Sequence, residues 1–228
     1  MNFDDLKLEQ VVLQLNYDSG YRYWDKCGET IIEIQKAFPE WTWREIRRDG
    51  TVLENQKTEH MSLLFSWDTI RLIQHEVENL NQFRNYCGEI PRIITKCLSI
   101  EKYQRVGNRF WYIYKVQDIE SGQKEITRAK LLEIPAEKIK LFGDRIKAKS
   151  FTIVFEKNDL DIRLFVDVFK RADVPQNLVV DEEFHPEHMI RFDVDIHTDK
   201  EVNVEAFDCR EFVQKNKNLI ANNLAKFF

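Results

Sequence analysis

Apolar residues recur at every second position along several stretches of the chain, and this alternation predicts half-buried strands. In the first half the predicted strands are 9–17, 41–48, 60–67 and 69–77. Asp49-Gly50 after the second of these is a strong hairpin signal. Apolar spacings of three and four predict helices over 25–38 and 79–99. Pro91 lies inside the second helix, where we expect a kink or a division.

The second half follows the same pattern. Its first strand is 105–116, and a helical segment is predicted from 124 to 142, interrupted at Pro135. Strands at 147–157, 160–170 and 189–198 come next, the last of them after a loop at 174–188. A closing helix is predicted over 209–227. Asp208 is its expected N-cap with Glu211 three residues on, and Phe207 is placed to contact Phe212.

Both halves therefore read strand, helix, three strands, long helix. We predict an α+β fold of two pseudo-repeated β-α-β-β-β-α units, 1–101 and 102–228, packed as one compact body. Their antiparallel sheets would be covered on one face by the helices. The strand at 105–116 opens the second unit, so a continuous or closely apposed sheet is expected there.

The composition indicates an ordinary globular protein of 228 residues, long enough to bury a large core without disulfides. The four cysteines contain no Cys-x-x-Cys pair, and no 18-residue apolar run exists. The N-terminal residues lack the basic head and apolar stretch of a signal peptide. We therefore expect a cytoplasmic protein with no membrane association.

Charge is unevenly distributed along the chain. Residues 92–149 carry 14 Lys and Arg against 7 Asp and Glu, whereas 1–91 and 150–228 each carry 10 against 16. A basic middle between acidic ends is either a docking surface for an anionic partner or a segment that pairs with those ends in the fold. The overall pI of about 5.7 is lower than a nucleic-acid-binding domain usually shows.

The run Arg-Val-Gly-Asn-Arg-Phe-Trp-Tyr-Ile-Tyr-Lys at 105–115 stands inside the basic segment. Arg105, Asn108 and Arg109 are its candidate binding residues, because arginines beside exposed aromatics hold phosphates and stack bases. A nucleic-acid-binding module using 92–149 is one hypothesis. The structural alternative is that the aromatics are core residues, Gly107 marks a bulge or close approach, and Arg109 pairs with an aspartate on a neighbouring strand.

The same run, together with Phe-Asp-Val-Asp-Ile-His-Thr at 192–198, resembles two motifs of a sporadically distributed family of uncharacterised bacterial proteins. The motifs are a basic residue, glycine, arginine and aromatics, and then an apolar-Asp-apolar-Asp strand before a final helix. The chain departs from the family at Tyr114, where many members carry Asn. The resemblance implies no particular activity. The family's distribution implies an association with mobile loci such as bacterial defence or toxin–antitoxin systems.

The last predicted strand places acidic and imidazole side chains at alternate positions. Asp193, Asp195, His197 and Asp199 therefore share one face of it. Carboxylates with a nearby imidazole are suitable ligands for Mg²⁺, Mn²⁺ or Zn²⁺, and such a metal activates water for hydrolysis. The alternative is that these residues form the solvent face of an antiparallel strand.

The sequence contains no nucleophile elbow, no glycine-rich phosphate loop and no serine in an evident arrangement with histidine. We therefore expect a non-catalytic protein-interaction or accessory protein, without a cofactor, that binds a protein partner and has room for a homodimer. The alternatives are a metal-dependent hydrolase using Asp193 and Asp195, and the nucleic-acid-binding module above.

Overall fold

The computed structural model describes residues 5–47, 50–58, 60–128, 150–173 and 186–227. The strands are β1 (Lys7–Asn16), β2 (Trp41–Arg47), β3 (Gly50–Asn55), β4 (Met61–Phe65), β5 (Thr69–His75), β6 (Lys102–Tyr103), β7 (Arg105–Lys115), β8 (Phe151–Lys157), β9 (Leu160–Lys170), β10 (His188–Thr198) and β11 (Val202–Asn203). The α-helices are α1 (Arg22–Ala37), α2 (Leu80–Leu98), α3 (Ile119–Arg128) and α5 (Cys209–Phe227), and Arg171–Asp173 forms a 3₁₀ turn.

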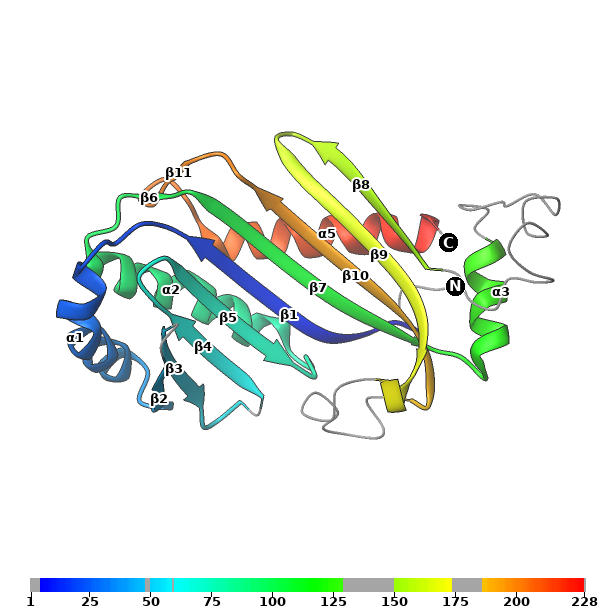
Figure 1. Ribbon diagram of the computed structural model, residues 1–228, viewed down its shortest axis with the longest axis horizontal. Helices are drawn as coiled ribbons and strands as arrows, with labels where there is room; N and C mark the ends of the chain where they lie inside the picture. The colour runs from blue at the N-terminus through cyan, green and yellow to red at the C-terminus, as the bar shows by residue number, and fades with distance from the viewer. Residues whose placement is uncertain (1–4, 48–49, 59, 129–149, 174–185, 228) are drawn as a thin grey trace.

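Nine of these strands form one antiparallel sheet in the order β2-β3-β4-β5-β1-β7-β10-β9-β8. Strand β7, next to the central strand β1, pairs with β1 on one side and with β10 on the other. The two halves of the chain thus share a continuous sheet at the strand where the sequence predicted their junction (Figure 1). β6 and β11 form a separate two-stranded ribbon at one end.

The helices pack on one face of the sheet, where alternate strand residues form the core. Val11, Leu13 and Leu15 of β1 are fully buried there, as are Val106 and Phe110 of β7. In Figure 1, α2 and α5 run behind the sheet. α3 packs on the same side, because a Cβ added to Gly122 would lie 2.7 Å from Val168 Cγ1. We call this side the helix-covered face.

Several local expectations are confirmed. Asp208 caps α5 through Oδ1, which accepts hydrogen bonds from the backbone N–H of Arg210 and of Glu211. Phe207 contacts Phe212, with ring centroids 5.3 Å apart. β2 and β3 form an antiparallel hairpin at the predicted hairpin signal, and Gly50 of that signal is the first residue of β3, paired with Arg47.

Other expectations are corrected. Four strands lie between α1 and α2, whereas the sequence predicted three. The strand that was not predicted is the short β3. α2 runs from Leu80 to Leu98 without a division at Pro91, and Pro91 is buried within it. α3 begins at Ile119 and not at 124, and the rest of the helix predicted to 142 lies outside the described residues.

The coarse α+β prediction is confirmed, and the relation of the two halves by duplication stays a prediction. None of the described helices is both long enough and apolar enough to cross a membrane.

A candidate anion-binding site on the open sheet face

The second face of the sheet carries polar side chains from five adjacent strands. It presents the alternate residues of β5, β1, β7, β10 and β9, and no described helix lies over it; we call it the open face. The strand register aligns these residues in rows across the sheet, since directly paired residues project to the same side. One row contains Arg71, Gln14, Gly107, His197 and Asp161. The next contains Ile73, Val12, Arg109, Asp195 and Arg163.

A pocket of about 370 Å³ opens on this face across these rows. Its lining comes from all five strands: Gln10, Val12, Gln14, Arg71, Ile73, Arg105, Gly107, Arg109, Trp111, Arg163 and Asp195. Because four of these residues are arginines and one is a carboxylate, we call it the arginine pocket. Its volume is at the lower end of that of small-molecule sites.

Arg109 is held by a two-point ion pair with Asp193. Arg109 Nε donates to Asp193 Oδ1 at 2.7 Å, and Nη2 donates to Oδ2 at 2.5 Å. The bond to Asp193 raises the pKa of Arg109 further above its already high ordinary value. The guanidinium also lies 4.8 Å from the centroid of the Trp111 ring. This arrangement fixes Arg109 at the wall of the pocket through charge and ring contact together.

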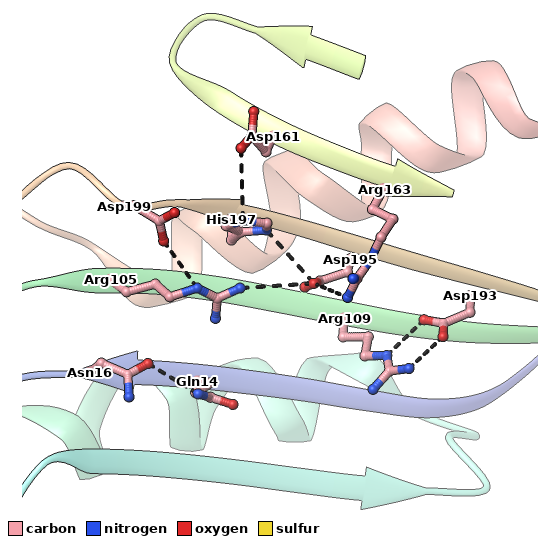
Figure 2. A network of polar contacts seen from close by, with 10 residues as sticks. All are labelled: Gln14, Asn16, Arg105, Arg109, Asp161, Arg163, Asp193, Asp195, His197 and Asp199. Atoms are coloured by element: carbon pink, nitrogen blue, oxygen red, sulfur yellow. Dashed lines mark hydrogen bonds and ion pairs between the residues drawn. The ribbon is translucent and has the colours of Figure 1, made fainter. Parts of the chain in front are cut away.

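Arg105 extends along the sheet above a glycine. Its Nε lies 3.2 Å from Asp199 and its Nη2 lies 3.9 Å from Asp195. Its Nη1 occupies the space over Gly107, 3.0 Å from where a Cβ would stand. Figure 2 shows the unshared nitrogens of Arg105 and Arg109 directed toward β1. Gly107 therefore leaves room for the guanidinium on the pocket floor.

Asp195 lies at the centre of the charged residues in Figure 2. Arg163 Nη2 donates to its Oδ2 at 3.1 Å, and Arg105 approaches the same oxygen. His197 Nδ1 lies 3.7 Å from this oxygen, and His197 Nε2 lies 3.9 Å from Asp161. One carboxylate thus faces two arginines and an imidazole.

Arg71 differs from the other arginines of the pocket. Within the described part of the chain, no carboxylate lies within ion-pair distance of it, and its Nε is buried without a hydrogen bond. Because this Nε is closed off from solvent, a ligand in the pocket would meet the terminal nitrogens of the Arg71 guanidinium. The positive charge of the pocket is therefore least compensated on its β5 side.

The side chain of Trp111 is engaged by cations. Arg191 lies 5.1 Å from its ring centroid, in addition to Arg109. Arg191 also lies 4.8 Å from the ring of Phe169 and 5.7 Å from that of Phe165. Register places Arg191 opposite Ile113, two residues beyond Trp111, while Arg109 lies two residues before it. The indole thus stands between two guanidinium groups.

The three binding residues proposed from the sequence do not all lie on the same face of the sheet. Arg105 and Arg109 lie on the open face, in the pocket. Asn108 projects to the helix-covered face, where it is 1% exposed and donates from Nδ2 to Val12 O at 2.6 Å. Two pocket arginines, Arg71 and Arg163, were missed. They are ordinary polar positions of alternating strands, and only the order of strands in the sheet brings them to the site.

The candidate metal ligands do share one face, as the alternation predicted. Asp193 and Asp195 both make ion pairs with arginines, and His197 lies next to Asp195. No group of three or more His, Cys, Asp or Glu suited to a metal ion occurs among the residues described. The metal hypothesis, for Mg²⁺ or Mn²⁺, stays a prediction. The expectation that Arg109 pairs with an aspartate of a neighbouring strand is confirmed.

No protein-family model matches the chain, and no curated protein matches it in sequence. The resemblance drawn from the two motifs therefore stays a prediction, and the chemistry of the site has to be argued from its own residues.

Proposed function

We propose that this chain is a non-catalytic interaction protein whose open face receives an anionic segment of a partner protein in the arginine pocket. The observation that carries the proposal is Arg71, a pocket arginine without a carboxylate partner in the described chain. An acidic group from a partner would accept hydrogen bonds from its terminal nitrogens and neutralise its charge.

The surrounding pocket supports this proposal. Arg109 is held by two hydrogen bonds to Asp193, and Arg105 lies within ion-pair distance of Asp199 and Asp195, so both are oriented before a ligand arrives. Pre-positioned guanidinium groups lose less side-chain entropy on binding than free surface arginines do. Gln10 and Gln14 line the same pocket on β1, with their amide nitrogens at hydrogen-bond distance from His75 and Asn16. The pocket thus combines charged walls with a neutral polar strand.

The nucleic-acid alternative has less support. Trp111 is the aromatic residue of the pocket, and two guanidinium groups lie within about 5 Å of its ring. Base stacking needs a free aromatic face. Two of the four pocket arginines also come from outside the basic segment 92–149.

The proposal is tested with a labelled oligoglutamate peptide followed by fluorescence anisotropy at low salt. We expect binding that weakens as salt is added, because the contacts are charge-based. Arg71→Glu should abolish it. Arg44→Glu is the matched control, since Arg44 is an exposed arginine of the same sheet that lies outside the pocket.

Absence of binding, or equal loss with both variants, would contradict the proposal. A labelled oligothymidylate in parallel separates the alternative. Tighter binding of that strand, lost in Arg105→Glu, would favour nucleic acid over a protein partner.

A further inference from the structure

We infer that the anionic group received by the arginine pocket is the phosphoryl group of a phosphomonoester, seated between Arg71 and the Arg105 guanidinium that lies over Gly107. This inference rests on the proposed function and specifies the chemistry of the ligand. Three observations support it: the pocket's arginine donors come from different strands, Gly107 leaves room for the Arg105 guanidinium, and the pocket has more arginines than paired carboxylates.

Three of the pocket residues lie in a single row of the sheet. Arg71 on β5 stands opposite Gln14 on β1, which stands opposite Gly107 on β7. Neighbouring strands are about 4.8 Å apart, so Arg71 and Gly107 are separated by about 10 Å at the backbone. Arg71 and the Arg105 guanidinium over Gly107 thus line the pocket from opposite sides of β1.

The internal ion pairs leave some arginine N–H groups of the pocket unused. Arg105 directs Nε to Asp199 and Nη2 to Asp195, which leaves Nη1 over Gly107. Arg109 uses Nε and Nη2 for Asp193, so its Nη1 takes no part in that pair. No guanidinium nitrogen of Arg71 is engaged by a described carboxylate. The available N–H groups come from two strands on either side of β1.

Such a divided set of donors fits a tetrahedral oxyanion better than a planar carboxylate. A carboxylate is satisfied by one guanidinium in one plane, as the Arg109–Asp193 pair already shows. A phosphoryl group presents three oxygens in different directions and so accepts from several guanidinium groups at once.

The charge balance points the same way. Four arginine charges of the pocket face the carboxylates of Asp193, Asp195 and Asp199, and these carboxylates pair with Arg105, Arg109 and Arg163. The excess lies at Arg71. A phosphomonoester carries about −1.5 to −2 at neutral pH, enough to neutralise Arg71 and to compete for Arg105. A single carboxylate supplies at most −1.

The test compares two peptides of one sequence by calorimetry, one with phosphoserine and one with glutamate at the same position. We expect the phosphopeptide to bind at least about tenfold more tightly, since several charge-assisted hydrogen bonds replace one pair. Arg71→Ala should reduce its affinity to the level of the glutamate peptide. Arg71→Lys keeps the charge without the planar fork, and it should restore only part of the affinity. Arg44→Ala should leave binding unchanged.

A second variant distinguishes a loss of binding from a loss of folding. Gly107→Ala moves the Arg105 guanidinium and leaves Arg71 intact, so it should weaken phosphopeptide binding while the melting temperature changes little. Free phosphoserine and inorganic phosphate form separate arms. Binding of these as tight as that of the phosphopeptide assigns the pocket to a small phosphomonoester, whereas much weaker binding assigns it to a phosphorylated protein segment.

Two results would overturn the inference. Equal affinity for the glutamate and phosphoserine peptides would show that the pocket responds to charge alone, and the proposed function would stand without the inference. Failure of both peptides and of free phosphate to bind would remove the inference and the proposed function together.

Discussion

Arg109 pairs with Asp193, although Asp195 stands directly opposite it on β10. Because Asp193 stands opposite Trp111, this diagonal ion pair draws the Arg109 guanidinium toward Trp111 and away from Gly107. It also leaves Asp195 for Arg163 and Arg105. One off-register ion pair thus determines how the remaining charges of the open face are distributed.

We expect this pair to be coupled in stability. Asp193 is 8% exposed and Arg109 is half-buried, so screening by solvent is partial. A double-mutant cycle with Asp193→Asn and Arg109→Gln, measured by urea unfolding, should give a coupling of about 1–2 kcal/mol. A coupling near zero would mean that the two-point contact does not persist in solution.

Asn108 should act on stability and not on binding. Its side chain is buried on the helix-covered face and bonds to Val12 O across the β1–β7 junction. Asn108→Ala should lower the free energy of unfolding by about 1–3 kcal/mol, because a buried carbonyl loses a donor and a small cavity forms. Its phosphopeptide affinity should equal that of the unchanged protein. A selective loss of affinity would place Asn108 in the site after all.

Two glycines should respond oppositely to alanine. A Cβ on Gly28, an exposed position of α1, meets nothing within 4 Å, so Gly28→Ala should stabilise by about 0.5–1 kcal/mol. Gly50 has φ +152° and its Cβ would lie 2.7 Å from Phe65 O. Gly50→Ala should destabilise by about 1–3 kcal/mol. Thermal melts of both variants test the pair, and shifts of the same sign would contradict it.

Stability should fall at alkaline pH through buried thiols. Burial raises the pKa of Cys209 to about 12 and that of Cys87 well above its usual value. In the unfolded chain both thiols ionise near pH 8.5, so above that pH the unfolded state releases protons that the folded state retains. The free energy of unfolding is therefore unaffected by these thiols below about pH 8.5. Above that pH it falls by about 1.4 kcal/mol per pH unit for each thiol, until the thiol of the folded protein ionises.

Cys209→Ala removes one of these groups. Its free energy of unfolding, measured from about pH 8 to about pH 10, should therefore decline less steeply than that of the unchanged protein. Parallel declines would show that Cys209 does not contribute.

Much of the fold follows from local pattern. Strict alternation identified β1, β7, β9 and β10, and it also showed that Asp193, Asp195 and His197 share a face. Applied to the whole of β7, the same alternation places Asn108 on one face of the strand and Arg105 and Arg109 on the other. β3 was missed because a six-residue strand with mostly buried positions on both faces shows little alternation.

The arginine pocket lay beyond local pattern for a different reason. Arg71, Arg105 and Arg163 belong to strands distant in sequence, and their proximity depends on the order β5-β1-β7-β10-β9. Their pairing depends on register, which a shift of one residue would invert. Neither the strand order nor the register can be read from a short stretch of sequence.

The central position of β1 bears on synthesis of the chain. Val12 and Asn108 meet across the β1–β7 pair although 96 residues separate them. A nascent chain that has already formed β2 to β5 and α2 still presents the ten-residue β1 as an unpaired edge until β7 emerges from the ribosome. Unpaired edges recruit other chains. The wait is longer for β7, whose second edge stays unpaired until β10 is made, so the interval between β7 and β10 is when the nascent chain is most exposed to co-translational aggregation.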